Sequence, residues 1–522
     1  MRNRNRYIYI MVLAVLGFQA EAQGQEKIQY APRLVVNITI DQLRTDYLEA
    51  FAPLYGANGF KKLLSQGLVY ENASYPFSTI DRASAISSVI TGVSPYYHSI
   101  IGEKWLNKET LRPVLCTDDP KQAGLSSPNQ LQVSTLGDEL KVATQGQAKI
   151  FAIAPHEDAA ILSAGHAADG AFWLDTKTGQ WKTSTYYLNA LPSWLLGVNE
   201  LRSPSYNIKN TVWQPVIELS GTFNYYQHVG DQKPFKHPFK GERKFIEYQA
   251  SGLINADVTE MAQQCVTNYG VGYDRVTDLL CLTYYAGTYD HKPVSECQLE
   301  LQDTYVRLDR ELAKLISSLE GRLGAEHVLF VLTSTGYTDE ESVDYAQYKI
   351  PTGDFYIDRT ANLVNMYFGA IWGQGRYVEA HFKNQIFLNH QLLESKRISL
   401  TDAGQRAQEF ISQLEGVRNV YTALQLLGGN NPQIYKVRNG FNPERNGDIL
   451  IEVSPGWRVL NESGQDSQLS RASFIPFPII FYGAGTKAER VKTPVTIDRI
   501  APTIAKTIRI RAPNACSAEP LF

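Results

Sequence analysis

Short apolar runs alternate along this chain with segments whose apolar residues recur at helical spacing. The runs are rich in Val, Ile and Phe, which is typical of strands buried on both faces of a sheet. We predict strands over Arg33–Ile40, Lys149–Ala154, Asp278–Tyr285, His327–Ser334, Asp448–Val453 and Pro478–Tyr482. The spacing predicts amphipathic helices over Gln298–Leu319 and Thr496–Ile508, with Pro502 in the first turn of the second. This alternation predicts an α/β fold in which helices sandwich a mainly parallel sheet.

Two stretches break this pattern. Residues 170–250 are rich in Trp, Tyr, Asn, Pro and Lys, and we interpret them as an inserted aromatic cap lobe. A second, smaller insertion is expected at about 340–445. The aromatic side chains of the lobe could form a binding face or could simply pack; they are Phe172, Trp173, Trp181, Tyr186, Tyr187, Trp194, Trp213, Tyr225 and Tyr226.

The first 22 residues are typical of a secretory signal. Arg2, Arg4 and Arg6 precede the apolar run from Tyr7 to Phe18, and Ala20-Glu21-Ala22 offers small residues for cleavage. The alternative is an uncleaved anchor. After residues 1–22 there is no run of 18 apolar residues, so we expect residues 23–522 to form one exported domain with no transmembrane segment. A periplasmic or secreted protein is predicted.

Composition excludes some functions. The 522 residues are 43% hydrophobic and 20% charged, as in ordinary globular proteins, and the net charge of -3 gives no basic surface for nucleic acid. The five cysteines are Cys116, Cys265, Cys281, Cys297 and Cys516. They allow at most two disulfides, whose pairing the sequence does not determine. No two of them have CxxC spacing, so a cysteine-based zinc site is not expected.

Candidate chemistry lies at the carboxyl ends of the predicted strands, where open parallel sheets bind ligands. Asp41 ends the first strand and is either a metal ligand or a helix cap. Ser78 and Thr79 precede a predicted helix, whose N-terminus would favour an attacking hydroxyl. Capping of that helix by Thr79 or Asp81 is the competing interpretation. His98 is expected to be a packed structural residue.

Several segments resemble the alkaline phosphatase superfamily. They include FKKLLSQG, ITGVSPYYH, ILSAGH, GAFWLD, DTYVRLDREL, NMYFGAIWGQG, LIEVSPGW, PIIFYG and IAPTIAKTI. The chain is most similar to bacterial periplasmic alkaline phosphatases with a threonine nucleophile, of the type I phosphodiesterase/nucleotide pyrophosphatase kind. The resemblance implies two zinc ions about 4 Å apart that activate the nucleophile and bind the leaving oxygen.

The resemblance implies that few of the family's catalytic residues remain. Asp41 matches the early Asp ligand, and His291 matches the His of the DxxxH motif. The nucleophile position falls on Ile80, or on Thr79 after a shift of one residue. Asp290 is adjacent to His291, but neighbours on an extended segment point to opposite sides. Asp41 and His291 are therefore remnant ligands, fewer than a catalytic zinc requires.

The other ligand positions lack ligand atoms. Gly287 stands where the Asp of DxxxH is expected, and Thr335-Gly336 replaces an Asp-His pair. The late His position falls on Pro476, and no His follows His390 in the sequence. The resemblance therefore implies a degenerate metal site.

The groups that should contact phosphate are replaced as well. Glu103 stands for the family's Asn, and His156 and Asp158 stand for a Lys and an Arg. A carboxylate facing a phosphate dianion is repulsive by about 1–4 kcal/mol per contact at moderate dielectric. We expect this pocket to reject phosphomonoesters.

Two hypotheses follow. In the first, the protein is a pseudophosphatase that needs no cofactor and binds an unknown ligand or an envelope protein partner. In the second, it is a divergent hydrolase of phosphate monoesters, phosphodiesters or sulfate esters. That enzyme would use zinc, with Thr79 as nucleophile and a rearranged site of Asp41, Asp81 and His291. Metal content distinguishes the two hypotheses.

Overall fold

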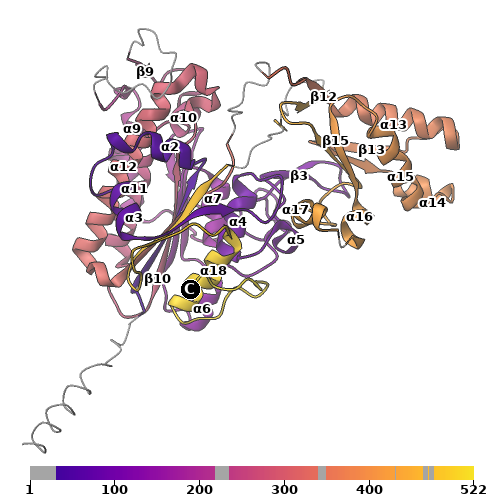
Figure 1. The fold of residues 1–522 in the computed structure, drawn as a ribbon. Helices are drawn as coiled ribbons and strands as arrows, with labels where there is room; N and C mark the ends of the chain where they lie inside the picture. Colours follow the sequence, from indigo (N-terminus) through magenta and orange to yellow (C-terminus); the bar gives the residue numbers. More distant parts are fainter. Residues whose placement is uncertain (1–30, 218–233, 339–347, 430, 462–467, 470–474) are drawn as a thin grey trace, which may run out of the picture.

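A computed structural model of the chain describes residues 31–217, 234–338, 348–429, 431–461, 468–469 and 475–522 (Figure 1). The expected leader at residues 1–22 lies outside these ranges, as do Tyr225 and Tyr226 of the expected cap. Among the described residues, no helix is both long and apolar enough to cross a bilayer.

A ten-stranded sheet runs through the centre of the molecule in the order β20-β2-β19-β11-β1-β10-β5-β6-β7, with β21 beside β2. The strands are β1 (Leu34–Asp41), β2 (Leu68–Ser74), β5 (Ile150–Ala154), β6 (Gly170–Asp175), β7 (Gln180–Lys182), β10 (Asp278–Tyr285), β11 (Val328–Ser334), β19 (Phe477–Gly483), β20 (Glu489–Val491) and β21 (Val495–Thr496). The five strands from β11 to β6 are parallel, whereas β19 is antiparallel to both neighbours. The predicted α/β fold with a mainly parallel sheet is confirmed.

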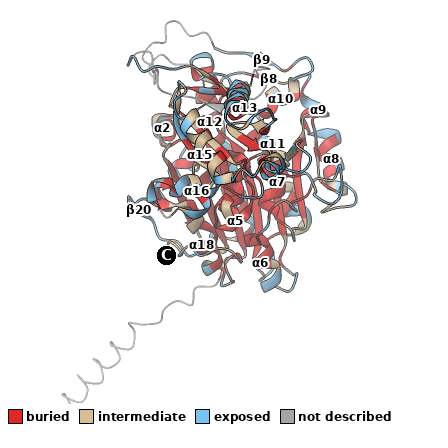
Figure 2. Cartoon of the chain, turned by 90° about the vertical axis from the view of Figure 1, so that its right-hand side faces the viewer, coloured by how far each residue is buried: buried red, intermediate tan, exposed pale blue. Residues whose placement is uncertain are grey.

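The alternation of side chains in β1 explains why helices cover both faces of the sheet. Leu34, Val36, Ile38 and Ile40 belong to one apolar cluster, whereas Val35 belongs to the other. The first cluster includes α2 (Thr45–Ala50), α3 (Phe60–Gln66), α8 (Ser193–Leu201), α11 (Ile254–Tyr269) and α12 (Val294–Leu323). The second includes α4 (Arg82–Thr91), α6 (Leu136–Ala143), α7 (Glu157–Ala164) and α18 (Ile500–Thr507). Figure 2 shows the strands buried among these helices.

The same alternation places the polar residues of β1 on the second face. Asn37, Thr39 and Asp41 share the side of Val35, and all three are buried. Asp41 is therefore directed towards the layer that contains α4 and α7.

The two predicted helices form with shifted ends. The segment Gln298–Leu319 lies within α12, which is kinked at Cys297. The segment Thr496–Ile508 contains a short 3-10 turn, η5 (Ile497–Arg499), followed by α18. Pro502 lies in the first turn of α18, where the backbone N–H groups have no intrahelical acceptor.

Residues 354–460, between β11 and β19, form a smaller α/β unit, which we call the accessory unit (Figure 1, right). Its four-stranded sheet consists of β13 (Val378–Phe382), β14 (Gln385–Leu388), β15 (Val417–Thr422) and β16 (Ile449–Val453). Its helices are α13 (Ile357–Trp372), α14 (His390–Ser395), α15 (Leu400–Ile411), α16 (Ala423–Gly428) and α17 (Tyr435–Asn439). The strand predicted over Asp448–Val453 thus exists as β16, but it belongs to this unit and not to the large sheet.

The expected aromatic lobe begins inside the large sheet, since β6 and β7 occupy residues 170–182. It continues through α8, α9 (Pro204–Asn207), β8 (Val212–Trp213), β9 (His237–Pro238) and α10 (Lys244–Gln249). Phe172, Trp173, Trp181 and Trp213 are buried in the apolar clusters. These four side chains pack and offer no binding face.

All five cysteines lie in described parts of the chain, and none of them forms a disulfide. Four of them are buried, and Cys516 is partly exposed. Their sulfur atoms contribute to packing without cross-linking the fold.

Candidate functional site

Asp41 lies at the carboxyl edge of the parallel strands, as predicted, and is 1% exposed. Its Oδ1 accepts a 3.0 Å hydrogen bond from the Thr335 hydroxyl, which follows β11. The Thr335 oxygen in turn accepts the backbone N–H of Gln42 at 2.9 Å. Because β1 and β11 are parallel neighbours, their ends meet here. The group that contacts Asp41 from the end of β11 is therefore the hydroxyl of Thr335 and not a second carboxylate that could bind a metal ion.

The loop before α4 presents the candidate nucleophile. Thr79 is exposed and has a left-handed backbone with φ of 62°. Asp81, not Thr79, is the N-cap of α4: its Oδ1 accepts the backbone N–H of Ser84 at 3.0 Å. Its Oδ2 accepts the N–H of Glu103 at 2.7 Å. Asp81 therefore caps the helix, and both of its carboxylate oxygens accept hydrogen bonds from backbone N–H groups.

Arg82, the first residue of α4, occupies the centre of the site. Its Nε lies 3.1 Å from both carboxylate oxygens of Asp158 at the start of α7. One terminal nitrogen lies 2.8 Å from Glu103 Oε1, and the other lies 3.6 Å from Asp41 Oδ2. Three carboxylates from three separate elements therefore meet one guanidinium.

Burial makes this cluster electrostatically strong. Only 10% of the Arg82 side chain is exposed, against 2% for Asp41, 11% for Asp158 and 42% for Glu103. Burial alone would lower the pKa of Arg82, but Asp158 and Glu103, with smaller effects of Tyr337 and Asp41, raise it well above its usual value. Arg82 is therefore fully charged.

Glu103 lies near two other carboxylates, those of Asp158 and Asp81, and they affect its pKa. Arg82 lowers the pKa of its carboxyl, but burial and the carboxylates of Asp158 and Asp81 outweigh that effect and raise the pKa to about 7. Because Glu103 is the most exposed of the three partners, water screens its ion pair most strongly.

The sequence predicts Glu103 and Asp158 only as groups that repel phosphate, and it does not predict a role for Arg82. The structure shows both carboxylates paired with that residue. A signal was present, because buried carboxylates require a cation and Arg82 directly follows Asp81 at the start of the predicted helix.

The two histidines near the cluster differ in environment. His156 Nε2 is buried and has no hydrogen-bond partner among the described residues. Burial, Arg82 and His291 lower the pKa of His156 well below its usual value, so its imidazole is neutral. His291 is exposed, and its ring lies 6.2 Å from the ring of Tyr285. Asp290, adjacent to His291, binds Arg243 of the cap at 2.8 Å.

The positions expected to have lost ligands also lack room for them. A Cβ atom on Gly287 would lie 2.6 Å from the Tyr285 hydroxyl. On Gly336, at φ of 69°, it would lie 2.6 Å from the ring of Tyr75. Neighbouring side chains therefore fill the space where an Asp and a His are expected.

The residues present do not fit a zinc pair. At Pro476, the third position where the resemblance implies a missing ligand, the side chain has no donor atom, and the backbone carbonyl accepts the Thr45 N–H at 3.0 Å. Within the described ranges, no group of three or more His, Cys, Asp or Glu is arranged to hold a metal ion. Asp41 is engaged by Thr335 and Arg82, and exposed His291 adds one imidazole.

The accessory unit holds the loop that carries Thr79. The Ser78 N–H donates to the Lys436 carbonyl at 3.0 Å, and the Asn439 amide donates to the Pro76 carbonyl at 2.9 Å. A Cβ atom on Gly440 would lie 2.8 Å from the Ser78 carbonyl. The loop is thus fixed by backbone contacts that leave the Thr79 side chain exposed.

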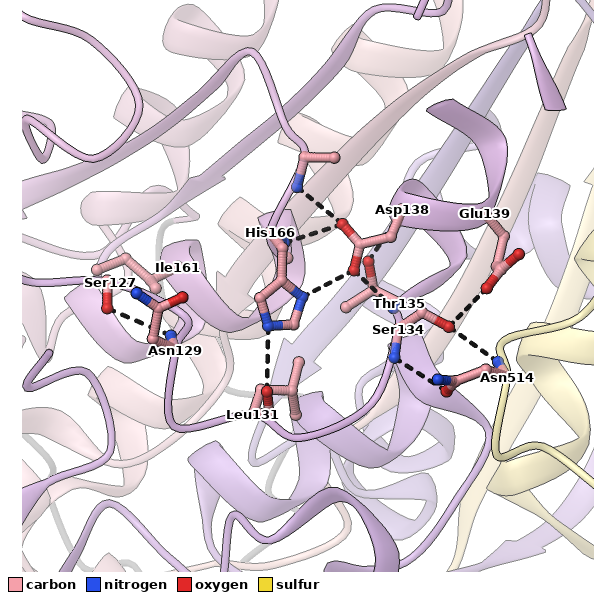
Figure 3. A network of polar contacts seen from close by, with 12 residues as sticks. Ser127, Asn129, Leu131, Ser134, Thr135, Asp138, Glu139, Ile161, His166 and Asn514 are labelled. Atoms are coloured by element: carbon pink, nitrogen blue, oxygen red, sulfur yellow. Dashed lines mark hydrogen bonds and ion pairs between the residues drawn. The ribbon is translucent and has the colours of Figure 1, made fainter. Parts of the chain in front are cut away.

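A second polar network lies at the amino ends of the parallel strands, just before the first residue of β6 (Figure 3). His166, from the ILSAGH segment, directs Nδ1 to Asp138 Oδ2 at 2.9 Å and Nε2 to the Leu131 carbonyl at 3.1 Å. Both partners are acceptors, so this geometry favours the protonated imidazole, which can donate from both nitrogens. Hydrogen bonding to Asp138 raises the pKa of His166 despite burial, while the pKa of Asp138 is lowered. This network joins the segment before β6 to α6 and to the loop that precedes α6.

Comparison with known proteins shows similarity in sequence and in structure over most of the chain. A family model described as type I phosphodiesterase / nucleotide pyrophosphatase matches residues 35–474. The chain is 29% identical to a protein named calcium-transporting ATPase from Myroides odoratus, over 97% of this chain and 96% of that protein. It is 28% identical to alkaline phosphatase PafA from Elizabethkingia meningoseptica, over 94% of each. The crystal structure of wild-type PafA superposes with a TM-score of 0.79 at 26% identity, over 94% of this chain and 98% of that one.

Proposed function

Because this chain belongs to the type I phosphodiesterase / nucleotide pyrophosphatase family of the alkaline phosphatase superfamily, we propose its function from what its centre retains of phosphatase chemistry. It is an exported pseudophosphatase, which keeps the fold, does not hydrolyse phosphomonoesters and acts by binding a ligand or an envelope partner. The observation that carries this proposal is the Arg82 guanidinium, ion-paired with Asp41, Asp158 and Glu103 where the strand ends meet.

Two physical arguments support the proposal. A catalytic zinc requires about three protein ligands, and Asp41, the buried remnant, is already bonded to Thr335 and paired with Arg82. A metal ion beside Arg82 would also place two positive centres in contact within a buried site. The centre is therefore complete without a Lewis acid.

A divergent hydrolase is the second candidate, and one observation favours it. Thr79 is exposed and immediately precedes Ile80, the other candidate position for the nucleophile. However, Asp81 is used as the cap of α4, so the rearranged set of Asp41, Asp81 and His291 would have to break bonds to Ser84 and Glu103. A phosphodiester or a sulfate ester would be the substrate, since each carries less charge than a phosphomonoester.

Metal content and hydrolysis test the proposal together. The protein would be produced with its own leader, supplied with zinc, and analysed by plasma mass spectrometry and with p-nitrophenyl esters of phosphate, phosphodiester and sulfate. We expect less than about a tenth of a zinc ion per chain and no hydrolysis above that of an Asp41→Ala variant. About two zinc ions per chain, with hydrolysis that Asp41→Ala abolishes, would refute the pseudophosphatase and support the hydrolase.

A further inference from the structure

Helix α13 of the accessory unit is apolar on its exposed side as well as on its packed side. The packed side enters the core of the unit through Ile357, Ala361, Val364 and Phe368. The exposed side carries Leu363 and Met366, whose residues are 41% and 70% exposed. A helix that covers a core normally presents charged residues to water, but no Asp, Glu, Lys or Arg occurs from Thr360 to Gly375. The exposed side of α13 is therefore typical of a contact surface.

This exposed side has a raised part and a low part. Leu363 and Met366 form the raised part. Gly369 and Ala370 form the low part, where Ala370 is exposed and a Cβ atom on Gly369 would meet nothing within 4 Å. The spacing of three, four and seven residues places all four on one side of the helix. When two copies of α13 lie antiparallel about a two-fold axis near Met366, the raised part of each helix faces the low part of the other.

Charge at the two ends of the helix favours the same antiparallel arrangement. Arg359 precedes Leu363 by one turn, so it shares this side, and it is exposed with its guanidinium 4.3 Å from the centre of the Tyr356 ring. The C-terminal end of a helix carries a partial negative charge. In the antiparallel pair, Arg359 of each copy reaches the C-terminal end of the other copy's helix, and no like charges meet between the two ends.

We propose that this side of α13, formed by Arg359, Leu363, Met366, Gly369 and Ala370, is an interface between two copies of this protein. The proposal goes beyond the pseudophosphatase assignment and does not depend on it. Figure 1 shows α13 at the outer edge of the accessory unit, away from the large sheet, so two copies can approach there without contact between their large sheets. A lipid surface fits this side less well, because helices that bind membranes combine apolar with basic residues.

The exposed area predicts a weak, concentration-dependent dimer. With about 200 Å² for a fully exposed side chain of this size, Leu363 and Met366 together with Ala370 present roughly 250 Å² of apolar surface per copy. Two copies and a polar rim then remain below the ~1,200 Å² at which stable complexes begin. We therefore expect half of the protein to be dimeric at a concentration of about 10–100 µM.

Sedimentation velocity of the protein produced with its own leader tests the proposal. The native protein should shift from monomer to dimer as its concentration rises from about 1 to 200 µM. Met366→Glu should weaken this association at least about tenfold, because an unpaired carboxylate would be buried at the axis. Val142→Glu on α6 is the matched control, since Val142 is 71% exposed but lies on another surface, and it should leave the association unchanged.

Cross-linking tests the two-fold axis itself. A side chain at such an axis meets the same side chain of the other copy, so Met366→Cys should give a disulfide-linked dimer under a mild oxidant. Val142→Cys should remain a single chain. The native protein is the blank, because four of its cysteines are buried and Cys516 is partly exposed.

Four results would overturn the proposal. The first is a native protein that stays monomeric up to about 200 µM. The second is a dimer that forms equally in Met366→Glu, since another surface would then hold it. The third is a native dimer without a cross-link in Met366→Cys, which excludes the antiparallel axis. The fourth is a monomer that binds vesicles of phosphatidylethanolamine and phosphatidylglycerol and loses that binding in Met366→Glu, which would assign this side to a lipid surface.

Discussion

The ion pair between Arg82 and Asp158 allows a quantitative prediction for Asp158→Asn. This substitution keeps the shape of the side chain and one acceptor oxygen but removes its charge. Both partners are about nine-tenths buried, with Nε 3.1 Å from each carboxylate oxygen. At an effective dielectric of 20, unit charges about 4 Å apart attract by about 4 kcal/mol.

Two features of the cluster reduce that figure. Arg82 keeps the carboxylates of Glu103 and Asp41, so its charge is not left uncompensated. The substitution also removes a repulsion, since Asp158 is one of the groups that raise the pKa of Glu103. We therefore expect Asp158→Asn to lower the free energy of unfolding by about 1–3 kcal/mol, below the 3–5 kcal/mol of a buried pair broken outright.

Thermal unfolding measures this loss, and an exposed ion pair supplies the control. Arg490 and Glu71 lie 2.9 Å apart, but their side chains are 55% and 28% exposed. Glu71→Gln should therefore change stability by at most about 1 kcal/mol. If Asp158→Asn costs no more than Glu71→Gln, the cluster does not stabilise the fold in the way that its geometry implies. The carboxyl pKa of Glu103, followed by NMR, should fall below about 7 in the same variant.

Three further predictions concern other parts of the chain. Asp138 raises the pKa of His166, so the charged imidazole stabilises the fold fully below its unfolded pKa of about 6.5, and this stabilisation is lost as pH rises through the folded pKa. His166→Gln should therefore reduce the change of the free energy of unfolding with pH between these two pKa values. An unchanged dependence of unfolding on pH would contradict this. Thr79→Ala should change the free energy of unfolding in urea by no more than about 0.5 kcal/mol, because the side chain is exposed. It should leave ester hydrolysis unchanged, because the proposed pseudophosphatase uses no nucleophile, and a loss of hydrolysis would support the hydrolase instead. Gly336→Ala should lower the free energy of unfolding by about 1–3 kcal/mol, because φ is 69° and the new Cβ would lie 2.6 Å from the Tyr75 ring. The control is Gly321→Ala, whose Cβ would meet nothing within 4 Å and which should leave the free energy of unfolding unchanged or raise it.

The fold could be predicted because its strands are apolar on both faces. The predicted strand over Asp278–Tyr285 coincides with β10, and all of its residues are buried. The strand over Asp448–Val453 shows the limit of this reasoning. Its pattern predicts a strand, but sheet membership depends on long-range pairing with β14 and β15, which local spacing does not encode.

The site could be predicted only in part. Asp41 was placed correctly at the edge of the sheet because it directly follows an apolar run. The position of Arg82 at the centre of the site could not be predicted, because the direction of a side chain at a helix start depends on what packs against it. The sequence predicts Glu103 and Asp158 only as neighbours of a phosphate, because residues so distant in sequence do not reveal that the fold pairs both with one cation.

The positions where the resemblance implies missing ligands support the proposal of a repacked centre, rather than of an otherwise unchanged centre from which single ligands were removed. Had single ligands been exchanged on an otherwise unchanged site, small residues would leave space around Gly287 and Gly336. Instead the Tyr285 hydroxyl and the ring of Tyr75 occupy that space, and the Tyr75 hydroxyl donates to the Ser334 carbonyl at 2.8 Å. Reintroducing an Asp and a His would therefore displace buried aromatic side chains, and the Arg82 charge would still oppose a metal ion. Packing, hydrogen bonding and charge at this centre therefore all support the proposal of a centre that works without a metal ion.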